Sequence, residues 1–224
     1  MKTTRSGELI DIGEVIQSGV VFDFKNWQGG AVDAEHLPQA VAHLFALLEN
    51  KNIEYVLVGG VAILHYVEGR NTQDIDFILD AEALEKLTEL EVVSRDEYFA
   101  QARFQGLRVD LLLTRHALFR RVREKYSATR AFQGRQVRCA TVEGLLLLKL
   151  FALPSLYRRG NLDKVALYEA DLFMLLPRMT LSPDLLFEEL RPHLSDSDFG
   201  EVRKITDEIR QRIERFERKR EEKE

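Results

Sequence analysis

Residues 53–79 read IEYVLVGGVAILHYVEGRNTQDIDFIL, and this stretch decides the fold. It opens with Ile53 to Val58, a short apolar run rich in β-branched residues that ends in Gly59-Gly60. That pattern predicts a buried strand that runs into a tight turn. A helix is expected directly after the turn, over 61–66, and the next strand over 74–79.

Two aspartates alternate with Ile75 on the second of these strands. Because side chains on a strand alternate between its faces, Asp74 and Asp76 project from the same face. Carboxylates so close repel each other, and they are tolerated at an exposed strand end or where divalent cations neutralise them. Asp110 interrupts another apolar stretch, 107–113, where a buried carboxylate without a partner would be costly.

If the strands at 74–79 and 107–113 are neighbours, these three carboxylates converge on one point. Such a cluster can hold two Mg²⁺ ions, one to activate an attacking hydroxyl and one to grip a triphosphate and its leaving pyrophosphate. The turn at Gly59-Gly60 allows close approach of the backbone to a ligand and can direct N–H groups at an anion. A diglycine or a D-x-D motif alone is more often a plain turn, loop or cap, whereas their combination is far more specific.

The joint pattern resembles a known family. Gly59-Gly60-x-Ala62-x-Leu64 and Arg70-x-Thr72-x-Asp74-Ile75-Asp76, with Asp110 on a later strand, are similar to the DNA polymerase beta-like nucleotidyltransferase superfamily. They look most like its AbiEii-type branch, the toxins of type IV toxin–antitoxin pairs. The resemblance covers residues 53–113 well and the remainder loosely.

The resemblance implies a nucleotidyltransferase core in which Asp74, Asp76 and Asp110 are metal ligands and Asp110 is also the base. The implied cofactor is a pair of Mg²⁺ ions, for which Mn²⁺ can substitute. Many members of the superfamily carry Gly-Ser at the turn, whereas Val61 follows Gly60 here. Backbone N–H groups would then have to bind the phosphates.

Further nucleotide contacts are implied in the same way by the resemblance. Gly59, Gly60, Arg70 and Thr72 are expected around the phosphates. Arg70 is also consistent with a residue that orients the D-x-D loop, and Thr72 is equally consistent with a turn residue. The family places a lysine on a helix after the core and an aspartate further along, and these correspond to Lys149 and Asp171. Without the resemblance, Lys149 would be interpreted as a lysine that extends out of a core helix to solvent.

The rest of the chain predicts a mixed α+β protein. Helices are expected over 37–48 and 81–90, one hairpin around Gln105-Gly106 and a second through Gly134. From Thr141, a suitable helix N-cap, every pattern is helical. We therefore expect a loosely structured segment over 1–35, a core with a small nucleotidyltransferase-type sheet and flanking helices over 36–140, and a helical C-terminal module over 141–224.

Composition bounds the class of protein. The chain has 224 residues, of which 45% are hydrophobic and 31% charged, and this composition excludes collagen-like and mostly disordered proteins. Its single cysteine, Cys139, rules out an intrachain disulfide and a thiolate metal cluster. The sequence offers no apolar segment long enough to span a bilayer. We therefore expect a cytoplasmic protein with no membrane partner.

Charge is unevenly distributed. The segment Arg115 to Arg138 contains eight basic residues and one acidic residue, so it carries +7 while the whole chain carries −5. Beside a nucleotidyl-transfer site, such a segment would attract a polyanionic acceptor such as RNA. The alternative is that helix and hairpin simply carry these arginines to solvent.

Three functions remain open from the sequence. The first is metal-dependent transfer of an NMP from an NTP to an acceptor hydroxyl. By resemblance that hydroxyl is the 3′ end of tRNA, and the protein is a toxin with an antitoxin partner. The second is nucleotidyl transfer to a small molecule, as in antibiotic-modifying relatives. The third is an inactive relative that only binds nucleotide or a partner protein.

Overall fold

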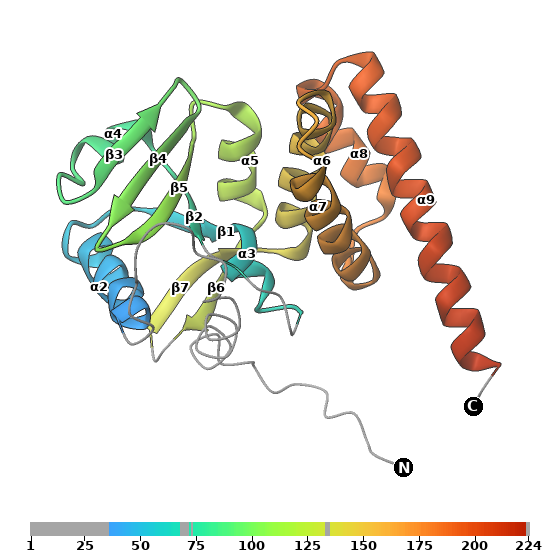
Figure 1. Ribbon diagram of the computed structural model, residues 1–224, viewed down its shortest axis with the longest axis horizontal. Coiled ribbons are helices and arrows are strands. Elements are labelled where there is room, and N and C mark those ends of the chain that lie inside the picture. The colour runs from blue at the N-terminus through green and yellow to red at the C-terminus, as the bar shows by residue number, and fades with distance from the viewer. Residues whose placement is uncertain (1–35, 68–71, 73, 133–134, 223–224) are drawn as a thin grey trace, which may run out of the picture. The chain divides into compact units, whose positions relative to one another are not determined.

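The computed structural model describes residues 36–67, 72, 74–132 and 135–222. These residues form two compact units. The first contains the described residues up to Arg123 together with Ser127–Ala140, and the second contains Glu124–Tyr126 and the described residues from Thr141 onward. Figure 1 shows the sheet of the first unit and the helices of the second.

The first unit is built on one mixed sheet with strand order β3-β4-β5-β2-β1-β7-β6. β2 pairs with β5 and β1 with β7 in parallel, and the other pairs are antiparallel. This arrangement confirms the mixed α+β class. The strands are β1 (Tyr55–Val58), β2 (Asp74–Leu79), β3 (Glu91–Arg95), β4 (Phe99–Phe104), β5 (Leu107–Leu113), β6 (Ser127–Phe132) and β7 (Arg135–Ala140).

Helices α2 (His36–Asn50) and α5 (Ala117–Lys125) pack on the sheet through aromatic side chains. Phe45 of α2 makes an edge-to-face contact with Phe77 of β2, with ring centroids 5.8 Å apart. Phe119 of α5 contacts Phe99 of β4 at 5.2 Å. Such contacts add to the burial of the apolar rings and fix the helices on the strands. The helices α3 (Gly59–Ile63) and α4 (Ala81–Glu85) are single short turns.

The expected helix over 81–90 is wrong beyond Glu85. The chain turns after α4 and forms the strand β3, which the sequence analysis did not predict. β3 lies at the edge of the sheet and pairs only with β4, so its residues stay exposed and show no alternation of polar and apolar residues. The hairpin around Gln105-Gly106 is confirmed. Both residues have positive φ, 50° and 82°, which is the type I′ geometry favoured in two-residue hairpins.

The second unit is helical throughout its described residues from Thr141, as predicted. The Thr141 hydroxyl accepts a hydrogen bond from the Gly144 N–H and caps the first helix. Val202, Ile205 and Ile209 of the last helix are buried within this unit. Its elements are α6 (Val142–Arg158), α7 (Leu162–Leu175), η2 (Leu176–Arg178), α8 (Pro183–Leu190), η3 (Arg191–His193) and α9 (Asp196–Glu221).

Within the part of the chain that the structure describes, no helix combines the length and the apolar character needed to cross a membrane.

Candidate active site

The register of β2 and β5 brings the three predicted carboxylates together. These strands run parallel, with Asp76 beside Asp110 and Asp74 beside Arg108. Residues that face each other on neighbouring strands share one face of the sheet, so these four side chains lie on the same face. The alternating residues Ile75 and Val109 are buried on the opposite face. The neighbouring strands expected from the sequence are therefore confirmed, and they place the three carboxylates on one face of the sheet.

The backbone at Gly59 lies directly against the carboxylate of Asp76. Its φ is +65°, in the left-handed region that side chains disfavour. A Cβ placed on Gly59 would lie 1.9 Å from Oδ2 of Asp76, far closer than atoms can approach. Glycine is thus required twice here, by backbone conformation and by the neighbouring carboxylate. The turn and the carboxylate form one compact structural unit.

Asp110 is only half satisfied. Its Oδ2 accepts a hydrogen bond from Nη2 of Arg108 at 3.2 Å. Its Oδ1 is buried and has no hydrogen-bond partner among the described residues. A buried carboxylate oxygen without a donor costs free energy, and such an atom in a folded protein often marks the position of an ion or water ligand.

Arg108 is the site residue that the sequence analysis missed. Its Nη2 also lies 3.8 Å from Oδ2 of Asp74, so one guanidinium contacts two of the three carboxylates. Partial burial alone would lower the pKa of Arg108, but the charges of Asp110, Asp74 and Asp76 outweigh it and raise the pKa. The strand period of two contained the signal, because a residue two positions before Asp110 must share its face.

The residues fit a divalent cation by their chemistry. Carboxylate oxygens from two neighbouring strands are the hard ligands that Mg²⁺ prefers, and Oδ1 of Asp110 lacks a donor. Across residues 36–67, 72, 74–132 and 135–222, however, no three side chains of ligand type are disposed to hold an ion as they stand. The Arg108 guanidinium holds two of the three carboxylates instead.

Thr72 contacts Asp74 at the start of β2. Its hydroxyl lies within hydrogen-bond distance of the backbone oxygen of Asp74, at 3.1 Å, and of its Oδ1, at 3.3 Å. It therefore orients the first carboxylate, and a contact of Thr72 with nucleotide stays a prediction. Arg70 lies outside the described residues. Gly60 and Val61 are buried, so the position after the diglycine packs into the core.

Lys149 and Asp171, the other two residues implied by the resemblance, meet inside the helical unit. Nζ of Lys149 on α6 lies 2.7 Å from Oδ2 of Asp171 on α7, and the side chains are 7% and 0% exposed. The same ammonium lies 3.7 Å from the ring centroid of Tyr168, a cation–π contact. Lys149 therefore does not extend to solvent. Its predicted contact with nucleotide stays a prediction.

The basic segment from Arg115 to Arg138 is partly neutralised by acids from elsewhere in the chain. Arg123 pairs with Asp80 at 2.6 Å, a contact supported by the Thr114 hydroxyl on the same carboxylate. Further pairs join Lys125 to Glu189, Arg135 to Glu49 and Arg115 to Glu82. The segment is thus less available to a polyanion than its formal charge indicates.

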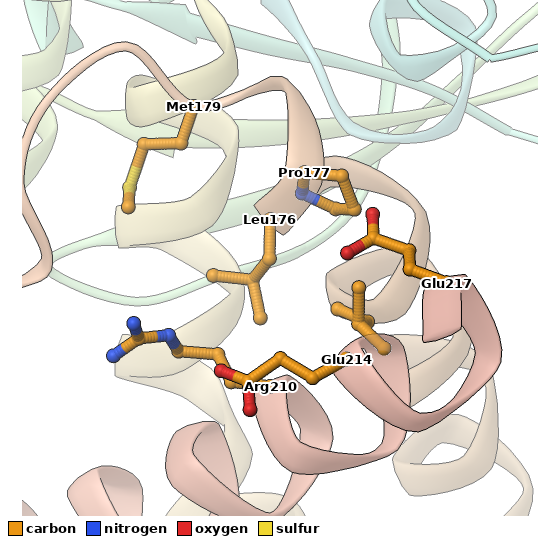
Figure 2. Close-up of a pocket in the computed structure, with 7 residues that line it drawn as sticks. Leu176, Pro177, Met179, Arg210, Glu214 and Glu217 are labelled. Atoms are coloured by element: carbon orange, nitrogen blue, oxygen red, sulfur yellow. The ribbon is translucent and has the colours of Figure 1, made fainter. Parts of the chain in front are cut away.

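A pocket within the helical unit contains none of the predicted site residues. Figure 2 shows its apolar side, formed around the η2 turn, opposite charged side chains of α9. Its lining residues are Leu176, Pro177, Met179, Arg210, Ile213, Glu214 and Glu217.

Comparison with solved structures finds similar chains at low sequence identity. A crystal structure of an antigenic nucleotidyltransferase-like protein from Paracoccidioides brasiliensis is 19% identical, with 80% of this chain and 95% of that chain covered and a TM-score of 0.49. A crystal structure of ANT(2″)-Ia in complex with adenylyl-2″-tobramycin is 16% identical, with 78% of this chain and 97% of that chain covered and a TM-score of 0.42. The solution structure of the antibiotic-resistance factor ANT(2″)-Ia is 16% identical, with 82% of this chain and 96% of that chain covered and a TM-score of 0.44.

No protein-family model matches the chain, and no curated protein matches it. The solved structures above include nucleotidyltransferase-like proteins.

Proposed function

We propose that the chain is a metal-dependent nucleotidyltransferase that moves an NMP from an NTP to an acceptor hydroxyl. The observation that carries this proposal is the register that sets Asp76 beside Asp110, with Asp74 on the same face and Gly59 packed against Asp76. Three carboxylates on one partly exposed sheet face repel one another, and among the described residues Arg108 contacts only two of them. That arrangement is expected where a site is built for a cation-bound, anionic substrate.

Asp74, Asp76 and Asp110 would hold Mg²⁺, or Mn²⁺ in its place. When bound, the two ions supply charge neutralisation of the triphosphate and lower the pKa of the attacking hydroxyl. Gly59 allows the turn to lie close to Asp76, and we expect the backbone of Gly59 and Gly60 to approach the phosphates. Thr72 keeps the carboxylate of Asp74 in its orientation through the hydrogen bonds described above.

The reaction needs one base, and Asp110 is the residue we assign to it. Its Oδ1 has no donor among the described residues and can accept the proton of the acceptor hydroxyl. The hydroxyl oxygen then bonds to the α-phosphorus, the bond from that phosphorus to the α,β-bridging oxygen breaks, and pyrophosphate leaves.

The acceptor we propose first is the 3′ end of tRNA, with the chain acting as a toxin held in check by an antitoxin. The motif around Gly59-Gly60 and Asp74-Ile75-Asp76 supports this acceptor by its resemblance to AbiEii-type toxins. Ion pairs within the basic segment, such as Arg123 with Asp80 and Arg135 with Glu49, favour the second candidate, a small hydroxylated molecule. Such an acceptor needs no extended basic surface.

The test is incubation of the purified protein with Mg²⁺, each α-labelled NTP in turn, and either total tRNA or a panel of small hydroxylated antibiotics. Label on tRNA that disappears with Asp76→Asn supports the toxin reaction. Label on a small acceptor supports the second candidate. Nucleotide binding that depends on Mg²⁺ but gives no product with either acceptor would identify an inactive relative instead.

A further inference from the structure

Arg108 lies in a cluster that would otherwise carry three negative charges. Its guanidinium donates to Asp110 at 3.2 Å and lies 3.8 Å from Asp74, and the charge of Asp76 also acts on it. A single guanidinium that contacts two carboxylates occupies the space between them that a divalent cation needs. It neutralises only part of the charge, and Oδ1 of Asp110 is left without a donor.

The contacts of Arg108 are exchangeable because the side chain is 48% exposed, compared with 20% for Asp110 and 30% for Asp74. An ion pair at such a position is screened by water and is weak compared with a buried one. The planar guanidinium also matches a phosphate as well as it matches a carboxylate. A triphosphate that reaches this face therefore offers Arg108 an alternative partner.

We propose that Arg108 is the counter-ion of the carboxylate cluster in the nucleotide-free protein, that it competes with free divalent cations, and that it transfers to a phosphate of the NTP when nucleotide and cation enter together. This inference rests on the proposed function, because it takes an NTP as the ligand. It makes Arg108 a positioning residue with two opposite effects. It weakens the binding of a cation alone and strengthens the binding of nucleotide.

The chain provides a matched control in Arg103. This residue lies opposite Arg108 on the neighbouring strand β4, on the same face of the sheet, and is exposed. Among the described residues it makes no ion pair. Replacing Arg103 by Gln removes the same charge from the same face without removing the contacts to Asp74 and Asp110.

The first measurement is Mn²⁺ binding to the full chain without nucleotide, followed by electron paramagnetic resonance. Arg108→Gln should bind Mn²⁺ about fivefold tighter than the wild type, the size expected for losing a partly exposed competing ion pair. Arg103→Gln should change the affinity by less than about twofold, because its charge acts only through solvent. Equal or weaker binding by Arg108→Gln would overturn the counter-ion role.

The second measurement is binding of the α,β-methylene analogues of the NTPs, each in turn, at saturating Mn²⁺. Arg108→Gln should bind the preferred analogue about fivefold more weakly, as expected for losing a charge-assisted contact. Arg108→Lys keeps the charge and should show Mn²⁺ affinity near that of the wild type, which separates a charge effect from a folding defect. Unchanged analogue binding by Arg108→Gln would overturn the transfer to phosphate.

These results can be distinguished from failure of the proposed function. The predicted Mn²⁺ results without transfer of label in any acceptor assay would remove the enzymatic function and keep the counter-ion role. Transfer of label with Mn²⁺ affinity unaffected by Arg108→Gln would keep the enzyme and overturn the counter-ion role.

Discussion

Lys149 and Asp171 form a buried ion pair, whereas Arg108 contacts Asp74 and Asp110 on a partly exposed sheet face. In each cluster one basic side chain contacts carboxylates: Lys149 contacts one, and Arg108 contacts two. They differ in what would replace a lost partner. At the sheet, water or an ion can take the place of Arg108, whereas burial limits the access of water to the Asp171 carboxylate if Lys149 is lost.

Exposure to solvent decides whether an ion pair acts as a fixed structural contact or can exchange partners. A buried pair repays the desolvation of its charges only while both partners are present, so it acts as a fixed structural element. A half-exposed pair contributes little to stability and can exchange partners at small cost. On this basis the sheet cluster is suited to ligand exchange and the helical pair is suited to holding α6 against α7.

The largest effect on stability is expected from breaking the buried pair. Lys149→Met removes the ammonium that lies against the buried Asp171 carboxylate, so the free energy of unfolding should fall by about 3 kcal/mol. Chemical denaturation followed by circular dichroism measures this change. In the double variant Lys149→Met/Asp171→Leu most of the loss should be recovered, because no buried charge remains. A loss below about 1 kcal/mol in the single variant would contradict a structural role for the pair.

A second, smaller loss is expected from Gly59→Ala. The left-handed φ costs a residue with a side chain about 1–2 kcal/mol, and the added methyl group must also displace the Asp76 carboxylate. Thermal or chemical unfolding should show a loss of about 2 kcal/mol, and turnover should fall with it. Gly106→Ala is the control, because its φ is also positive but open space surrounds the site. Equal losses in stability and activity for both variants would show that the contact with Asp76 is unimportant.

At the sheet cluster the effect on stability should be smaller still and should depend on the cation. Without divalent ions, Arg108→Gln leaves three carboxylates to repel one another, and the expected loss is at most about 1 kcal/mol at this partly exposed position. Mg²⁺ should restore the loss, because a cation that binds only the folded state raises its stability. Scanning calorimetry in EDTA and then in Mg²⁺ measures both values. A loss that Mg²⁺ does not restore would place Arg108 with the structural pairs.

The smallest effect is expected at a surface pair of the basic segment. Arg135→Gln removes the contact with Glu49, in which both side chains are partly exposed, and should cost about 0.3 kcal/mol or less. Its effect on tRNA binding at low salt gives the more informative result. Unchanged binding would show that this part of the segment is engaged by Glu49, whereas a clear loss would show that RNA displaces the acid.

Much of the fold and part of the site could be predicted from local pattern. Backbone geometry alone dictates the shared sheet face and the hairpin, so both could be predicted. The signals were the period of two in Asp74-Ile75-Asp76, the diglycine after Val58 and the Gln105-Gly106 turn. The strand β3 was not predicted, since an edge strand with two exposed faces has no alternation to detect.

Other features of the molecule depend on contacts that sequence spacing does not express. The pairing of Lys149 with Asp171 arises from the packing of α6 against α7. The contact of Arg108 with Asp74 exists only because β2 and β5 are parallel neighbours in one register. A sequence pattern indicates which face a residue occupies, and only the register of neighbouring strands shows which charge lies next to it.

The most direct test of the account is pyrophosphate release from an NTP, measured with the acceptor found in the labelling assay, for the wild type and for Asp74→Asn, Asp76→Asn and Asp110→Asn. Loss of a metal ligand that supplies several kcal/mol should reduce the rate about 10³-fold or more in each variant, with the free energy of unfolding almost unchanged. EDTA should abolish release by the wild type. Retention of more than about a tenth of the wild-type rate by Asp76→Asn, or release that survives EDTA, would contradict a carboxylate-bound cation at the centre of this site.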